Sequence, residues 1–162
     1  MFVIKKIDRK TIIAVLLAIL LLLAIGVKLT FLSRLPTTAY CESVGNFCIQ
    51  IDEHCSFTDF FEQFNIAVDE NTMTESEITI PSVFNAVYES YNALQKNQGF
   101  DLNDYKGQKA VRYTFDVLND KEEYEVKANI IVCENRVIAG DLCTYALDGM
   151  MTTLTDKTMI QG

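Results

Sequence analysis

Residues 123–133 (EYEVKANIIVC) and 136–145 (RVIAGDLCTY) are two strand-like segments separated only by Glu134 and Asn135. A two-residue loop containing Asn between such segments predicts a hairpin. Pairing across this loop sets residue 132 against 137, 130 against 139 and 126 against 143. One face of the hairpin then carries Val126, Ala128, Ile130, Val132, Val137, Ala139 and Cys143. We expect this apolar face to hold the long helix of the domain.

That long helix is predicted to open at Pro81 and Ser82 and to stop before Gly99. Its apolar positions recur at helical spacing and are Phe84, Val87, Tyr88, Tyr91 and Leu94. We interpret this stripe as part of the core. Gly99 is the expected stop because helices commonly end beside a glycine.

Shorter elements complete the outer part of the chain. Ser56 followed by Asp59 predicts the N-cap of a short helix. Residues 69–75 (DENTMTE) are expected to be a polar turn, residues 77–80 a brief strand, and residues 111–117 an alternating strand. Together these elements predict an α+β fold, with an antiparallel sheet packed against one long helix.

Residues 12–25 (IIAVLLAILLLLAI) form an unbroken apolar run near the N-terminus. The run reaches 21 residues if it extends to residue 32 and if Lys28 snorkels its ammonium to the interface. A membrane-spanning helix needs about 20 residues, so we expect one transmembrane helix over residues 11–33, with the lipid bilayer as its partner. A secretory signal peptide is the alternative, but no A-x-A-like cleavage site follows the run.

Basic residues predict the orientation of this helix. Lys5, Lys6, Arg9 and Lys10 precede it, and after Arg34 no Lys or Arg occurs before Lys96. The positive-inside rule therefore predicts a single-pass protein of the cell membrane, with a cytoplasmic N-terminus and an outer C-terminal domain. Residues 35–162 hold eight basic and 21 acidic side chains, a net charge of −13. So acidic a domain is expected to bind no nucleic acid.

The expected organisation has five parts. They are a cytoplasmic N-terminus (1–10), the transmembrane helix (11–33), a stalk (34–55), an extracytoplasmic α+β domain (56–152) and a tail (153–162).

Five cysteines suit a domain outside the cytoplasm, where disulfides form. On the hairpin register above, Cys133 lies beside the turn and Cys143 lies at the far end, so these two should not pair. Cys48 and Cys55 are the candidate disulfide, and free thiols are the alternative. His54, the only histidine, is adjacent to Cys55, and in an extended segment the two side chains point apart. The spacing contains no short C-x₂₋₄-C pair of the kind that holds zinc.

Asp141, Cys143 and His54 are the functional candidates. Asp141 falls on a largely apolar strand face, where a carboxylate must be hydrogen-bonded or functional. Capping of a turn or helix is the structural alternative for it. Asp101, Asn103 and Asp104 are spaced as in a cation-binding loop, but Lys106 stands where a calcium loop has Gly. The sequence therefore predicts no catalytic residue, metal ligand or cofactor.

Three segments carry a resemblance to a known family: residues 80–102 (IPSVFNAVYESYNALQKNQGFDL), 104–117 (DYKGQKAVRYTFDV) and 137–151 (VIAGDLCTYALDGMM). They resemble a domain-of-unknown-function family of short membrane-anchored proteins from Gram-positive, largely clostridial bacteria. Residues 56–68 resemble the family's preceding helix more loosely, since that pattern usually has Gly-Trp in place of Asn65-Ile66. The resemblance implies an anchored, extracytoplasmic domain and supplies no catalytic residues.

These observations favour a non-enzymatic role: a membrane-anchored extracytoplasmic binding or regulatory module with a protein or envelope partner. Two alternatives remain open at this point. One is an envelope hydrolase or thiol enzyme using Cys55 with His54, or Asp141. The other is a structural subunit of a membrane complex. An enzyme should show a concave pocket with converging polar groups, whereas a binding module should show an exposed apolar patch.

Overall fold

The computed structural model describes residues 8–32, 36–118, 125–144, 149–156, 158 and 160. It divides into two compact units, Met1–Pro36 and Thr37–Gly162. Most of the expected cytoplasmic segment (1–7), the outer ends of the two hairpin strands (123–124 and 145) and parts of the tail lie outside the described residues.

The first unit holds one helix, α1 (Arg9–Leu32), of 24 residues. Its Arg9–Lys28 stretch is long and apolar enough to cross a membrane, and none of it is buried within the structure. Length and composition fit a membrane anchor, and they also fit a signal sequence near the N-terminus.

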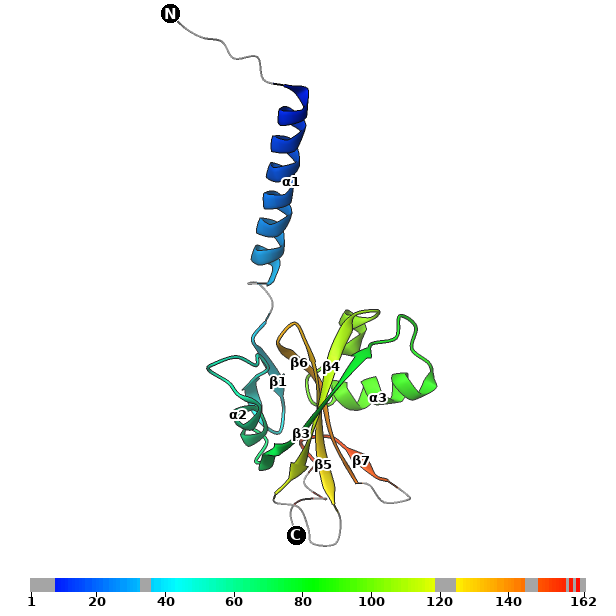
Figure 1. The fold of residues 1–162 in the computed structure, drawn as a ribbon. Coiled ribbons are helices and arrows are strands. Elements are labelled where there is room, and N and C mark those ends of the chain that lie inside the picture. Colours follow the sequence, from blue (N-terminus) through cyan, green and yellow to red (C-terminus); the bar gives the residue numbers. More distant parts are fainter. Residues whose placement is uncertain are drawn as a thin grey trace, which may run out of the picture. The chain divides into compact units, whose positions relative to one another are not determined.

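The second unit is built on a five-stranded antiparallel sheet with consecutive strands as neighbours (Figure 1). The strands are β3 (Val68–Thr79), β4 (Lys109–Val117), β5 (Val126–Cys133), β6 (Arg136–Thr144) and β7 (Met151–Thr152). With its helices the unit is α+β, as predicted. β3 is longer than expected, because residues 69–75 continue the strand through an irregularity between Asp69 and Thr74 instead of forming a turn.

The hairpin turn lies where the sequence places it. Glu134 and Asn135 both have positive φ, 48° and 61°, as a tight two-residue turn requires. The predicted register is correct only next to the turn, where Val132 pairs with Val137. A bulge then pairs Ile131 with Ala139 and shifts all later pairs by one residue. The shift turns Ala139 and Cys143 to the opposite face from the one predicted.

The N-terminal part of the unit covers one face of the sheet. It comprises β1 (Thr38–Cys41), β2 (Gly45–Cys48) and α2 (Phe57–Glu62), which lie on the opposite side of the sheet from α3 (Figure 1). Phe47 is only 2% exposed and its ring contacts Phe64 and Phe100 edge-on. From Thr37 onward, the segment predicted as a stalk is therefore part of the core, because it supplies aromatic and aliphatic side chains to it.

α2 begins as predicted. Ser56 accepts a hydrogen bond from the backbone N–H of Asp59, and the Asp59 carboxylate accepts one from the backbone of Ser56, forming a capping box. The buried rings of Phe60 and Phe61 then project from this short helix into the core.

The other face of the sheet is covered at one end by α3 (Ala86–Lys96) and the 3-10 helix η1 (Leu102–Tyr105). α3 begins later than predicted, at Ala86 after its N-cap Asn85, so Pro81 and Ser82 lie before the helix. Gly99 follows the helix at φ +89°, where the sequence predicts its stop. The helix does not rest on the Val126–Val132 face, where it was expected. It packs near Ile131, Cys133, Ile138 and Ala139 instead, because the N-terminal segment already covers the predicted face.

Two buried amide side chains, Gln95 of α3 and Gln98 in the turn after it, contact the sheet. Gln95 Oε1 accepts a hydrogen bond from the backbone N–H of Gly140 at 2.9 Å, and Gln98 Nε2 donates to the Gly140 carbonyl at 2.6 Å. Gln98 Oε1 also accepts from the backbone N–H of Leu154 at 2.8 Å. Two amide side chains therefore complete the hydrogen bonding of β6 at Gly140. They also fix part of the predicted tail, since Leu154 is fully buried.

Candidate functional site

A pocket of about 630 Å³ lies between α3 and the sheet. α3 covers the end of this sheet face near the β5–β6 turn, so the side chains further along the same strands remain open. The pocket is lined from α3 and from all five strands of the sheet. Its volume is within the range of roughly 300–1,000 Å³ usual for small-molecule sites.

One wall of the pocket is apolar. Val87 and Leu94 line it from α3, Ile78 from β3, Ile131 from β5 and Met151 from β7. Val87 is 75% exposed, so the stripe interpreted from the sequence as core is in part a pocket wall. Helical spacing identified Val87 and Leu94, but it could not distinguish a side chain that faces a core from one that faces a cavity.

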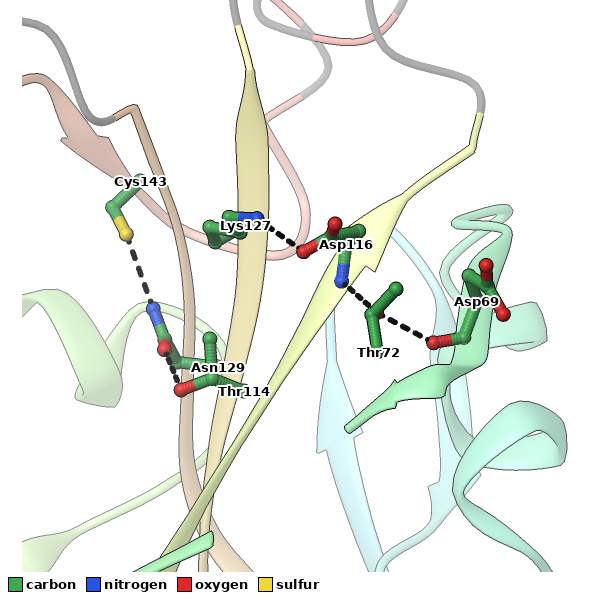
Figure 2. A network of polar contacts seen from close by, with 7 residues as sticks. All are labelled: Asp69, Thr72, Thr114, Asp116, Lys127, Asn129 and Cys143. Carbon is green, nitrogen blue, oxygen red and sulfur yellow. Dashed lines mark hydrogen bonds and ion pairs between the residues drawn. The ribbon is translucent and has the colours of Figure 1, made fainter. Parts of the chain in front are cut away.

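The floor of the pocket is a row of polar side chains on three neighbouring strands. Thr114 pairs with Asn129, and Asn129 pairs with Asp141, each directly across the sheet. Thr114 Oγ1 donates to Asn129 Oδ1 at 2.7 Å, and Asn129 Nδ2 donates to Asp141 Oδ2 at 2.8 Å. Asn129 Nδ2 also lies 3.2 Å from Cys143 Sγ, and Figure 2 shows the part of this row from Cys143 to Thr114.

α3 reaches the floor through Tyr91, whose hydroxyl donates to Asp141 Oδ1 at 2.8 Å. Asp141 is 4% exposed, and burial raises the pKa of its carboxyl, while the hydrogen bonds from Tyr91 and Asn129 act to lower that pKa. Burial and the neighbouring Asp141 raise the pKa of Tyr91 well above its ordinary value. Tyr91 therefore stays protonated and remains a donor.

Cys143 is half-buried beside this row, and burial raises the pKa of its thiol. A raised pKa keeps the sulfur protonated at neutral pH, which is unfavourable for a nucleophile. The bulge explains why Cys143 and Asp141 share this pocket, although the predicted register put both on the face opposite to it.

A second polar network, which contains the cation Lys127, lies on the neighbouring strands outside the pocket lining. Lys127 and Asp116, cross-strand partners, form an ion pair, and the Asp116 backbone N–H donates to Thr72 Oγ1 at 2.9 Å (Figure 2). Thr72 Oγ1 in turn donates to the Asp69 carbonyl at 2.7 Å. This chain of contacts fastens the irregular part of β3 to β4.

Arg112 is the cation that lines the pocket itself. Its side chain is exposed, and across the described part of the chain it has no hydrogen bond and no ion pair. Burial raises the pKa values of Asp141, Tyr91 and Cys143, and the charge of Arg112 acts against this rise at all three, as expected for a cation that lines the same pocket. Nothing in the sequence pattern singled out Arg112, because its role depends on the pairing of strands distant in sequence.

The remaining sequence candidates lie elsewhere. The side chain of His54 is 85% exposed, and it is not among the residues that line the pocket with Asp141 and Cys143. All five cysteines are free thiols in the structure. Burial, followed by a hydrogen bond with Cys48, raises the pKa of Cys55 to about 12, so these two sulfurs are neighbours. The Cys48–Cys55 disulfide stays a prediction.

The loop that resembles a cation site has a structural role. Asp101 caps η1 by accepting from the backbone N–H of Asn103 at 2.9 Å, and it pairs with Lys96 at 3.2 Å. Burial acts to raise the pKa of Asp101, but hydrogen bonds from Asn103, Asn92 and Lys96 outweigh it and lower the pKa to about 2. The Lys106 ammonium lies 4.2 Å from the centre of the Phe84 ring.

The fold and the pocket define a class: a small α+β domain that follows an apolar helix and holds a candidate small-molecule site. The family described as Domain of unknown function (DUF4830) matches residues 60–142, half of the chain, and the chain belongs to this family. No curated protein matches the chain, and no solved structure does. The matched region runs from within α2 to near the end of β6; it includes Thr114, Asn129, Asp141 and Arg112, and it ends one residue before Cys143.

Proposed function

We propose that this protein is a membrane-anchored extracytoplasmic module that binds a small molecule in the pocket between α3 and the sheet. The observation that carries the proposal is the pocket's two-sided lining, with an apolar wall facing a hydrogen-bonded polar floor. Concave sites with apolar walls and a few fixed polar groups are the usual form of ligand sites.

Binding fits this pocket better than catalysis. Both carboxylate oxygens of Asp141 already accept hydrogen bonds, and burial keeps the Cys143 thiol protonated. His54, the only histidine of the chain, does not line the pocket, so it cannot activate Cys143 there. A rigid floor of satisfied groups is suited to orienting a ligand.

The anchor and its orientation are part of the proposal. Residues 11–33 would cross the bilayer, and the basic residues before them favour a cytoplasmic N-terminus. The domain of net charge −13 would then lie outside the cytoplasm, close to the membrane surface. A tether restricts the domain to ligands of the envelope and of the bilayer itself.

A tryptophan placed at the mouth of the pocket tests the binding role. Ser90 is exposed and lines the pocket, so Ser90→Trp should fill it without disturbing the core. Ala93→Trp is the matched control, because Ala93 is exposed on the same helix but does not line the pocket. Mass spectrometry of organic extracts from protein purified out of native membranes should find a compound with the wild type and Ala93→Trp. The same compound at the same level in Ser90→Trp would contradict the proposal.

Protease treatment of intact protoplasts tests the orientation. A tag at the C-terminus should be removed while the cells stay closed. Survival of the tag until the membrane is permeabilised would show that the domain lies inside.

A further inference from the structure

We infer that the pocket takes an amphipathic anion, a single-chain carboxylate, whose head binds Arg112 and whose hydrocarbon chain lies on the apolar wall. The inference rests on the proposed function and names the chemical class of its ligand. It is carried by the placement around one cavity of Arg112, which forms no ion pair with the described residues, of the buried Asp141 and of an apolar wall.

The head group is assigned from the charges that a ligand can reach. Arg112 lines the pocket with an exposed side chain that the described residues leave without an ion pair. Guanidinium groups bind carboxylates through two parallel hydrogen bonds, which gives both affinity and orientation. Lys127, on the neighbouring strand, is already paired with Asp116 and offers no comparable site.

A cationic head is disfavoured by the same geometry. Asp141 is the acid in the pocket, but it is 4% exposed, and its two oxygens accept from Tyr91 and Asn129. An amine would have to displace one of these donors before it could pair with the carboxylate. The net charge of the domain favours cations at long range, but salt screens that field over about 8–10 Å, whereas Arg112 acts in direct contact.

The chain of the ligand is assigned from the opposite wall. Val87, Leu94, Ile78, Ile131 and Met151 present hydrocarbon to the cavity from four different elements. Each methylene moved from water onto such a wall strengthens binding by up to roughly fourfold. A ligand with a single hydrocarbon chain fits both this wall and the 630 Å³ volume. The anchor would keep the domain beside a bilayer, where such molecules are found.

Three eight-carbon probes with different head groups test the inference: octanoate, whose alkyl chain is one methylene shorter and which therefore gains no advantage from its chain, octylammonium and 1-octanol. The full chain is reconstituted in nanodiscs with ¹³C-methyl methionine, and the probes are titrated by NMR. Met151 lines the pocket and is the reporter, whereas Met73 is exposed on β3 and does not line it. Octanoate should shift the Met151 signal at roughly tenfold lower concentration than either other probe and should leave Met73 unchanged.

Variants on β4 connect this preference to Arg112. Arg112→Gln should remove the roughly tenfold advantage of octanoate over octanol, and Arg112→Lys should keep part of it. Lys109→Gln is the matched control, because it removes an exposed cation of the same strand from outside the pocket lining. The advantage of octanoate over octanol should be unchanged in Lys109→Gln. Each probe partitions into the nanodisc lipid to the same extent with every variant, so partitioning does not affect the comparison between variants.

The outcomes separate the inference from the proposed function. A preference for octylammonium overturns the anionic head. An octanoate preference that persists in Arg112→Gln overturns the binding of that head by Arg112. Either result leaves a binding pocket in place. If no probe shifts Met151, the ligand class inferred here is wrong. The extraction experiment with Ser90→Trp then decides separately whether the pocket binds a ligand at all.

Discussion

Gly99→Ala is expected to be among the most destabilising small substitutions in the domain. Gly99 follows α3 with φ +89°, and a Cβ added there would lie 2.3 Å from the backbone oxygen of Tyr40 in β1. Carbon–oxygen contacts are normally about 3.3 Å or longer, so β1 would have to move by about 1 Å. This contact joins the turn after α3 to the segment that the sequence predicted as a stalk.

The magnitude follows from two separate costs. A left-handed backbone costs a residue with a Cβ about 1–2 kcal/mol. Displacing β1 strains its packing, including the contact of Phe47 with Phe100 at 5.7 Å, and overpacking of this kind costs about 1–3 kcal/mol. The substitution should therefore lower the free energy of unfolding by about 2–5 kcal/mol, a large part of the ~5–15 kcal/mol typical of a domain.

Gly107→Ala is the matched control. Gly107 also has positive φ, +77°, but an added Cβ would meet no atom within 4 Å. Urea unfolding of the full chain in detergent micelles, followed by near-ultraviolet circular dichroism, should give a midpoint about 1 M lower for Gly99→Ala than for Gly107→Ala. Equal midpoints would show that β1 does not pack against the turn after α3, and the reasoning would fail.

Asp101, with a pKa of about 2 against an ordinary 3.8, contributes stability that is present above about pH 4 and lost as the pH falls towards 2. Because its side chain is partly exposed, this contribution is about 1 kcal/mol, and Asp101→Asn should abolish that part of an acid titration. The contribution of Asp141 has the opposite pH dependence. Because its pKa is raised in the folded state, this contribution to stability is greatest below about pH 4 and is lost as the pH rises through the folded pKa. Asp141→Asn should remove this contribution, and an unchanged pH profile of unfolding would contradict it. Air-oxidised protein should yield a Cys48–Cys55 peptide in non-reducing mass spectrometry, whereas reduced thiols after oxidation would refute that pairing.

Features set by a few neighbouring residues could be predicted from the sequence. Glu134 and Asn135 form the expected turn because two strand-like segments leave only two residues to connect them. Ser56 and Asp59 form the expected cap because both halves of the capping box lie within one turn. Local chemistry of this kind does not depend on what packs against it.

Features that depend on distant segments could not be predicted. The bulge between the Ile131 and Val132 pairs could not be predicted from the alternation of apolar and polar residues in either strand, yet it moves Cys143 to the other face. Pro36 and Gly45 led to the prediction of a stalk, but Phe47 and Ile49 pack against residues far along the chain, so this segment is part of the core. The pocket was missed for the same reason, since its lining comes from six elements.

The bond between Gly140 and Gln95 has a consequence for the dynamics of the site. Elsewhere in a sheet, an amide proton that is bonded to a neighbouring strand exchanges with solvent when the strands separate. The Gly140 proton is held by a side chain of α3, so it exchanges when the helix lifts away. Tyr91 and Leu94 on the same helix line the pocket. The hydrogen-exchange rate of this single amide therefore measures how often α3 lifts from the sheet and the pocket loses its helical wall.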